Sequence, residues 1–157
     1  MHSQDTKGIH AMNKKVSVKI SGLHSAESAD GTQSDDNIEV INIGSYYKRN
    51  GKHYVKYEEP VDMSDKSNSN LLKISNNEVE LISRGIRSTH MVFTRGQKNM
   101  NYYQTPFGSL NLWVDTYELS VSESDRKITV DIGYGLEVNL DYVNQCRVHI
   151  EIESLNQ

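Results

Sequence analysis

Apolar and polar residues alternate without a break from Lys127 to Tyr142. The apolar or aromatic positions are Ile128, Val130, Ile132, Tyr134, Leu136, Val138, Leu140 and Tyr142. A period of two is that of a β-strand with one buried face. A straight strand of this length would run about 50 Å, so we expect it to bend, and Gly133 and Gly135 on its polar face permit a tight coil. A long, bent strand with one apolar face predicts a closed or nearly closed β-barrel.

The rest of the chain also alternates in short runs, the first of which carries Val16, Val18 and Ile20. Asn50-Gly51 lies between two tyrosine-containing runs and predicts a two-residue hairpin with both turn residues at positive φ. Further strands are expected within residues 38–47, 52–58, 72–74, 79–81, 87–95, 100–104, 110–121 and 146–152, with turns at 76–77, 96–99, 105–108 and 122–127. Short turns between nearly all strands predict antiparallel, up-and-down pairing.

Some segments depart from simple alternation. The apolar parity shifts between Val40 and Ile41, which predicts a β-bulge. Residues 110–121 are partly apolar on both faces, so we expect this strand to lie where the sheet folds over itself or under a neighbouring loop. Residues 59–70 are rich in serine and aspartate and are expected to form a loop, with room for a helical turn, and residues 143–145 are expected to form a turn.

One domain accounts for the whole pattern, because 157 residues suit a single core. We assign residues 13–157 to an all-β, single antiparallel up-and-down β-barrel of about eight to ten strands. Residues 1–12 are polar and have no period, which is typical of a disordered leader or a cloning remnant, with Met12 as the expected true start. Residues 22–36 are expected to be a mobile loop within the domain.

Composition narrows the choice of partners and compartment. The net charge is −4, so nucleic acid is not the expected partner. No apolar run reaches the roughly 18 residues of a membrane span, and the N-terminus lacks the apolar stretch of a signal peptide. Cys146 is the single cysteine, which excludes an internal disulfide and fits a reducing compartment. These features favour a cytoplasmic protein, and no oligomeric state is predicted.

No catalytic, metal or cofactor motif is present in the sequence. The six histidines do not pair at ligand spacing, and Cys146 and His149 would point to opposite faces of one strand. Cys146 is expected on the apolar face as a buried structural thiol. Serine in a Gly-x-Ser-x-Gly turn and a glycine-rich phosphate loop are both absent. Adjacent tyrosines place one ring on each face of a strand, which favours cross-strand packing over a ring that lines a cavity.

The chain carries, in order, Arg84, Phe93, Gly96, Tyr103, Phe107-Gly108 and Thr116. This order resembles that of the YwiB-like family of small uncharacterised bacterial proteins, and the resemblance covers roughly residues 14–153. It implies a calycin-like, lipocalin-shaped barrel of about eight antiparallel strands. It implies no activity.

Charge is distributed unevenly and gives the candidate ligand site. Residues 81–114 carry four bases and no acid, whereas residues 115–157 carry nine acids and three bases. We expect the basic block to pair with the acidic strands, although a local basic patch is the alternative. If Met91 and Phe93 face the core, Arg95 lies at a barrel mouth.

A buried, unpaired guanidinium would cost several kcal/mol, so Arg95 needs an anionic partner. Glu137 or Asp141 on a neighbouring strand could supply it, which makes Arg95 structural. Alternatively an acidic ligand supplies it, with Tyr103 donating a hydrogen bond and Arg84 adding charge.

Three classes of function follow from these features. The leading hypothesis is a non-enzymatic barrel that binds a small anionic or amphipathic ligand or a protein partner, because small barrels can hold one small ligand. The alternatives are a small enzyme acting on a hydrophobic or anionic metabolite at the barrel mouth, and weak binding of single-stranded nucleic acid.

Overall fold

The computed structural model describes residues 14–22, 39–60, 66–85, 88–106, 108–138 and 141–155, and these residues form strands joined by turns. The expectations for residues 1–12 and 22–36 lie largely or wholly outside this part of the chain. Ten strands are formed: β1 (Lys14–Ser21), β2 (Glu39–Arg49), β3 (Lys52–Pro60), β4 (Ser67–Ile74), β5 (Glu78–Arg84), β6 (Ser88–Thr94), β7 (Lys98–Thr105), β8 (Gly108–Glu123), β9 (Lys127–Val138) and β10 (Asp141–Ser154).

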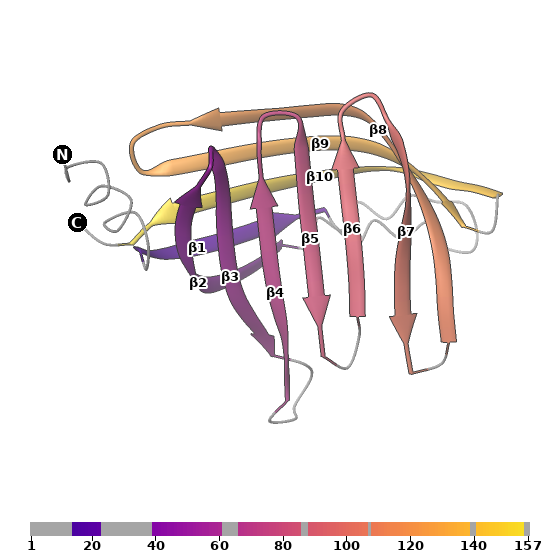
Figure 1. Ribbon diagram of the computed structural model, residues 1–157, viewed down its shortest axis with the longest axis horizontal. Coiled ribbons are helices and arrows are strands. Elements are labelled where there is room, and N and C mark those ends of the chain that lie inside the picture. Colours follow the sequence, from indigo (N-terminus) through magenta and orange to yellow (C-terminus); the bar gives the residue numbers. More distant parts are fainter. Residues whose placement is uncertain are drawn as a thin grey trace.

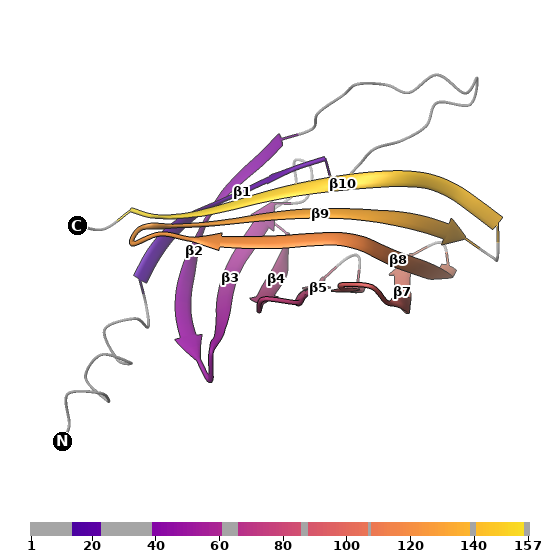
Figure 2. The same ribbon diagram turned by 90° about the horizontal axis from the view of Figure 1, so that it is seen from above.

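The ten strands form a closed antiparallel barrel in which each strand pairs with its neighbours in the chain and β10 pairs with β1. This confirms the predicted up-and-down barrel. The long strands β8, β9 and β10 run across the molecule, and β3 to β7 lie steeply inclined to them (Figures 1 and 2). The two groups of strands therefore face each other as the walls of a flattened barrel.

The core lies between these walls and is built from the alternating inward positions. Val18, Val55, Leu72, Ile74, Val114 and Val130 are fully buried, and Ile128, Ile132, Val148, Ile150 and Ile152 complete the apolar face of the long strands. Phe93 and Tyr134 meet across the barrel with ring centroids 4.9 Å apart. Met91 packs against the same cluster, as its shared face with Phe93 predicted.

The long strand is shorter than its alternation predicted. β9 ends at Val138, and Asp141 and Tyr142 belong to β10, where they pair with Val138 and Glu137. The predicted turn at residues 143–145 is wrong, because β10 continues through these residues and shifts register between Tyr142 and Asn144. Asn144 and Gln145, which are typical of a turn, here follow a register shift within a strand.

A second irregularity explains the two apolar faces of β8. Its register with β9 shifts between Thr116 and Glu118, so the inward positions change from even to odd numbers at Tyr117. Leu112 and Val114 point inward before this bulge, and Leu119 points inward after it. The two apolar faces of this strand therefore arise from one inserted residue, which changes the parity.

The bulge predicted between Val40 and Ile41 is also wrong. β2 pairs with β1 in unbroken register through this point. Ile41 and Ile43 are more than half exposed on the outer face instead. In the sequence, an apolar side chain on the solvent side of a strand shifts the apolar parity in the same way as a bulge.

Strand occupies both ends of the expected loop at residues 59–70, and residues 61–65 lie outside the described part of the chain. β3 extends to Pro60 and β4 begins at Ser67, where Glu59 pairs with Asn68 and Tyr57 with Asn70. Asn68 and Asn70 are buried. Polar residues that face the barrel interior resemble loop residues in sequence, so the strand was missed; the helical turn would fall on residues outside the described part of the chain.

Closure of the barrel leaves one edge of β8 without a strand partner beyond Asp115, where its pairing with β7 stops. The β6–β7 turn covers this edge, since Gly96 donates its backbone N–H to the Thr116 carbonyl and Gln97 accepts from the Thr116 N–H, at 2.8 and 3.0 Å. Arg95 then donates to the Leu119 carbonyl from Nε and Nη2, at 2.9 and 2.6 Å. These contacts satisfy backbone groups that an open edge would leave unpaired.

Asn50 and Gly51 close the β2–β3 hairpin with φ of 53° and 78°, which confirms the predicted turn. Gly51→Val should lower the free energy of unfolding by about 1 kcal/mol or more, because valine is strained at positive φ. No atom lies within 4 Å of the position of a Cβ at Gly51, so crowding adds nothing to this cost. Gly51→Asn is the control and should cost less, since asparagine tolerates this region. Equal denaturation midpoints for wild type and Gly51→Val would contradict the turn geometry.

The Cys146 side chain shares the inward face of β10 with Val148 and Ile150 and is 4% exposed. We therefore expect a thiol reagent to label Cys146 slowly in native buffer and rapidly after denaturation. In Ser120→Cys the new thiol lies on the exposed outer face of β8 and should be labelled rapidly in the native protein. Rapid native labelling of the wild-type protein would count against the closing position of β10.

Candidate functional site

One end of the barrel carries a pocket of about 100 Å³. It is bounded by the start of β1, the end of β2, the start of β3, the β8–β9 turn and the end of β10. Its walls include Lys14, Tyr46, Lys48, His53, Glu123, Ser124, Asp125, Arg126 and Lys127, with Val16, Ile128 and Ile152 as an apolar floor. Charged side chains thus gather where the apolar core ends.

A buried histidine lines this pocket. The His53 side chain is 4% exposed, and its Nε2 lies 3.1 Å from Oε2 of Glu123 at the end of β8. Its Nδ1 lies 2.8 Å from the Tyr46 hydroxyl on the neighbouring strand β2. Because a carboxylate only accepts, Nε2 carries the proton that joins His53 to Glu123. In the neutral ring, Nδ1 then accepts a hydrogen bond from Tyr46.

Tyr46 is held as a neutral phenol. Its burial, and then the negative charge of Glu123, raise the pKa of its hydroxyl above the ordinary value of 10.0. The ionised form is therefore disfavoured, and the hydroxyl serves as a hydrogen-bond group rather than as a base or nucleophile.

Two lysines lie beside this pair on the same face of the sheet. Lys48 is directly opposite His53 in the β2–β3 ladder, and Lys14 is directly opposite Tyr46 in the β1–β2 ladder. Side chains opposite each other in antiparallel strands have Cβ atoms about 5 Å apart. Neither lysine forms an ion pair with any described residue, whereas Lys127 on the same wall pairs with Glu151 at 3.0 Å. The mouth therefore carries two ammonium groups without anionic partners in the described part of the chain.

The predicted ligand residue Arg95 has a structural environment. It follows β6 at the Thr94–Lys98 connection, and its guanidinium donates to the backbone carbonyls of Leu119 and of Asn76, the latter at 2.9 Å. The carboxylate expected for it, Glu137, lies 2.8 Å from Lys98 instead. The alternative carboxylate, Asp141, has a side chain outside the described part of the structure. Lys98 thus shows the predicted pairing of the basic block with the acidic strands.

The structure does not bring Arg84, Arg95 and Tyr103 together. Arg84 ends β5 on its outward face, at the opposite end of the sheet from Arg95, because β5 and β6 run antiparallel and pair Ser83 with Thr89 and Glu78 with Thr94. Tyr103 pairs with Thr89, so it lies toward the Arg84 end but on the inward face. One small ligand cannot contact all three side chains, and anion binding at any one of them stays a prediction.

The adjacent tyrosines divide between the two faces as expected. Tyr46 points inward to His53, whereas Tyr47 stacks on Tyr54 on the outer face with ring centroids 4.9 Å apart. Arg49 and Lys56 each lie 5.9 Å from the centre of the Tyr47 ring. The outer pair is thus already engaged by neighbouring side chains, as cross-strand packing predicts.

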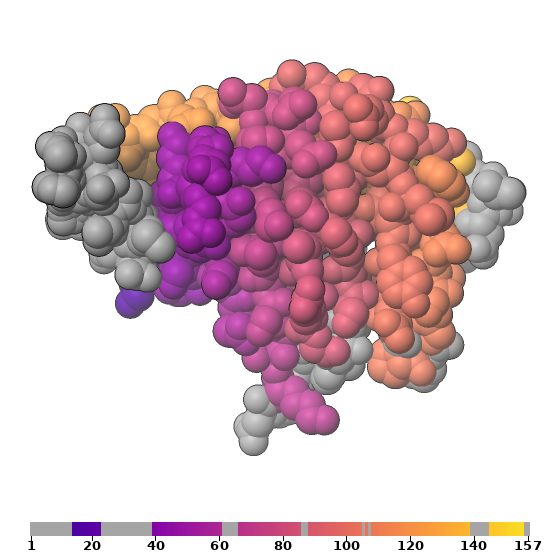
Figure 3. Space-filling model, in the orientation of Figure 1, coloured from indigo at the N-terminus to yellow at the C-terminus, as the bar shows by residue number. Residues whose placement is uncertain are grey.

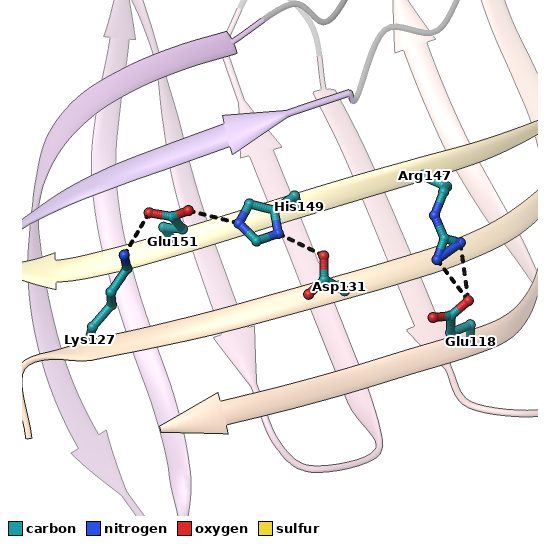
Figure 4. A network of polar contacts seen from close by, with 6 residues as sticks. All are labelled: Glu118, Lys127, Asp131, Arg147, His149 and Glu151. Carbon is teal, nitrogen blue, oxygen red and sulfur yellow. Dashed lines mark hydrogen bonds and ion pairs between the residues drawn. The ribbon is translucent and has the colours of Figure 1, made fainter. Parts of the chain in front are cut away.

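A network of charged side chains covers the outer face of the long strands (Figure 4). His149 lies between Asp131, 2.6 Å from its Nδ1, and Glu151, 2.8 Å from its Nε2. Glu151 also contacts Lys127, which gives a row of alternating charge across β9 and β10. Every member of this row has a partner, so the row is interpreted as surface stabilisation.

An ion pair between Arg147 and Glu118 crosses β9 on the same face, with the closest N–O distance 2.8 Å (Figure 4). Gly133 lies between these two residues in the ladders of β8, β9 and β10. A Cβ at Gly133 would approach Tyr117 Cε1 to 2.9 Å and Arg147 Nη1 to 3.1 Å. The glycine thus leaves room for a ring and a guanidinium to cover the strand.

Within the described ranges, no group of three histidine, cysteine or acidic side chains is arranged to hold a metal ion. Nor do those ranges contain a helix long and apolar enough to cross a membrane.

Comparison with known proteins identifies the family and the fold of this chain and assigns no activity. A family model described as a domain of unknown function, DUF1934, matches residues 18–150. The chain belongs to this family. It is also similar to an uncharacterized β-barrel protein, YwiB, of Bacillus subtilis strain 168, with 28% identity over 109 residues that cover 68% of this chain and 75% of YwiB.

The crystal structure of the ywiB protein from Bacillus subtilis has the same fold. It matches with a TM-score of 0.74 and 23% identity, over 94% of this chain and 98% of that one. The predicted YwiB-like family and the β-barrel are therefore confirmed. These comparisons assign no ligand and no enzymatic activity.

The His149 network should make stability depend on pH. Hydrogen bonds to Asp131 and then Glu151 raise the pKa of His149 above 6.5. The stabilisation is therefore complete below about pH 6.5 and is lost as the pH rises through the folded-state pKa. The same row lowers the pKa of Glu151 to about 2, so its contribution is lost only as the pH falls toward that value. His149→Gln should cost a few tenths to about 1 kcal/mol in mild acid and less in alkali, because the network is exposed.

Denaturant melts of wild type and His149→Gln at several pH values measure this difference. Arg147→Gln is the control, since its guanidinium stays charged throughout. A wild-type advantage that grew with rising pH would contradict the assignment.

Proposed function

We propose that this protein is a non-enzymatic binding barrel that receives a small anionic group in the pocket at the ends of β1, β2 and β3. The observation that carries the proposal is the placement of Lys14 and Lys48 beside the buried Tyr46–His53 pair, without ion-pair partners among the described residues. Arg126 adds positive charge from the β8–β9 turn, against Glu123 and Asp125.

The size of the pocket limits what enters it. The pocket volume is about 100 Å³. Pockets for drug-sized ligands are typically ~300–1,000 Å³. A carboxylate or phosphate group therefore suits this pocket, and the remainder of a larger ligand would lie outside it.

Binding is favoured over catalysis by the chemistry of the pocket. The raised pKa of Tyr46 keeps its hydroxyl neutral, and both nitrogens of His53 are engaged by Tyr46 and Glu123. An enzyme acting on the same anion, and a binder of single-stranded nucleic acid, are the alternatives. A cytoplasmic location fits a chain whose one cysteine can form no internal disulfide.

A thermal-shift experiment with phosphate, acetate and citrate tests the proposal. At a concentration about ten times the dissociation constant, a bound anion stabilises the folded state by about 1.4 kcal/mol, which raises Tm by about 3 °C or more for a domain of this size. The double variant Lys14→Gln/Lys48→Gln should lose this rise. Lys56→Gln removes a cation on the outer face of β3 and should retain it. Sodium chloride at matched ionic strength controls for screening.

Two results would overturn the proposal. The first is the absence of any shift beyond that of sodium chloride. The second is an equal shift in the wild type, the double variant and Lys56→Gln, which would mark non-specific ion effects. A fluorescent single-stranded oligonucleotide that bound more tightly than these anions would favour the nucleic acid alternative instead.

A further inference from the structure

A row of polar side chains lines the barrel interior at the end opposite the anion pocket. β3 runs from His53 in that pocket to Pro60 at the other end, and Tyr57 lies near its finish. From Tyr57 the cross-strand partners follow one another through β4, β5, β6 and β7, and the five residues are Tyr57, Asn70, Ser83, Thr89 and Tyr103. We call these five residues the polar belt.

The polar belt faces inward. Val55, Leu72 and Leu81 occupy the next inward positions on β3, β4 and β5, and all three are buried in the apolar core. Alternation along each strand then places Tyr57, Asn70 and Ser83 on the same face.

Three of the five belt residues are partly exposed to solvent. Ser83, Thr89 and Tyr103 are partly exposed although they face the interior, whereas Val55 and Leu72 are fully buried. The β6–β7 ladder comprises only three residue pairs, from Ser88–Gln104 to His90–Tyr102. Figure 3 shows a narrow crevice between these two strands. Solvent therefore reaches the belt at Ser83, Thr89 and Tyr103, whereas Tyr57 and Asn70 lie buried behind them.

One member of the belt carries a buried donor without a partner. Asn70 is 4% exposed, and its Oδ1 accepts a hydrogen bond from the Ser83 hydroxyl. Its Nδ2 is buried and has no hydrogen-bond partner among the described residues. Leaving such a donor unsatisfied is unfavourable, so an acceptor oxygen brought by a ligand would be stabilised here.

The chemistry of the belt is uncharged. It offers one amide, two aliphatic hydroxyls and two phenols, and burial raises the pKa of Tyr57 so that its hydroxyl stays neutral. The nearby charge is negative, since Glu59 also raises that pKa, and Arg84 points outward. An anion would thus be repelled at this end.

We propose that the polar belt binds a small neutral polyhydroxylated molecule, such as a monosaccharide or a cyclitol. Its polar groups recur at the strand spacing of about 4.8 Å, so a compact ring with several hydroxyls contacts two or three of them at once. A hydroxyl oxygen accepts from Asn70 Nδ2, and hydroxyl hydrogens donate to the oxygens of Ser83 and Thr89. The ring faces of Tyr57 and Tyr103 cover its apolar edges.

Titration with glucose, ribose and myo-inositol, followed in ¹⁵N-edited NMR spectra, tests the proposal. The side-chain amide signal of Asn70, assigned by its loss in Asn70→Leu, should shift on binding. Thr89→Val removes one hydroxyl with little change in volume, and it should weaken the affinity by about five-fold for one lost hydrogen bond. Thr129→Val makes the same change on the outer face of β9, opposite Glu151, and should leave the affinity unchanged.

Three results would overturn the proposal. The first is the absence of a shift at Asn70 with all three probes, and the second is equal affinity in Thr89→Val and Thr129→Val. The third is a stronger shift at Asn70 with choline or acetate, which would mark a charged ligand. Thr89→Val keeps the proposal testable if Asn70→Leu fails to fold. The anion pocket lies at the other end of the barrel, so a negative result for either proposal does not contradict the other.

Discussion

The structure depends on how the barrel closes along β8. This strand is longer than its partner β7, so its edge beyond Asp115 would expose backbone groups. The β6–β7 turn meets this edge at Thr116, Arg95 meets it at Leu119, and His53 of the β2–β3 hairpin meets its end at Glu123. Each contact satisfies polar groups where the two walls join. The last of them also fixes the wall of the anion pocket, so closure and the candidate site share one element.

This arrangement divides the interior into two regions. Near the anion pocket the inward positions are apolar and fully packed, as at Val18, Ile74 and Val130. At the opposite end the inward positions of β3 to β7 become polar and partly solvated. The packed region supplies the apolar burial that holds the fold, at about 25 cal/mol per Å². The two ends of the barrel are therefore free to carry different polar chemistry.

Alternation of apolar residues was enough to predict the barrel, because a half-buried strand must show a period of two. Alternation failed where local geometry breaks the period. The inserted Tyr117 made both faces of β8 seem apolar, and the exposed Ile41 gave a shift of parity that resembles a bulge.

The candidate site was harder to predict. His53 is two residues past the turn glycine, on the inward face with Val55, and this pattern was visible. Its partner Glu123 is 70 positions away, so only the closed barrel brings them together. Arg95 lies just past the end of β6, and its partners are backbone carbonyls, which sequence patterns do not identify.

The most direct measurement of the central claim is a crystal structure grown with selenate and recorded at the selenium absorption edge. Selenate is a tetrahedral anion of the class proposed for the pocket, and its anomalous signal locates it without regard to surrounding density. The account predicts a peak beside Lys14 and Lys48, against the Tyr46–His53 pair. Peaks confined to Arg84, Arg95 or the outer lysines, with none in the pocket, would contradict it.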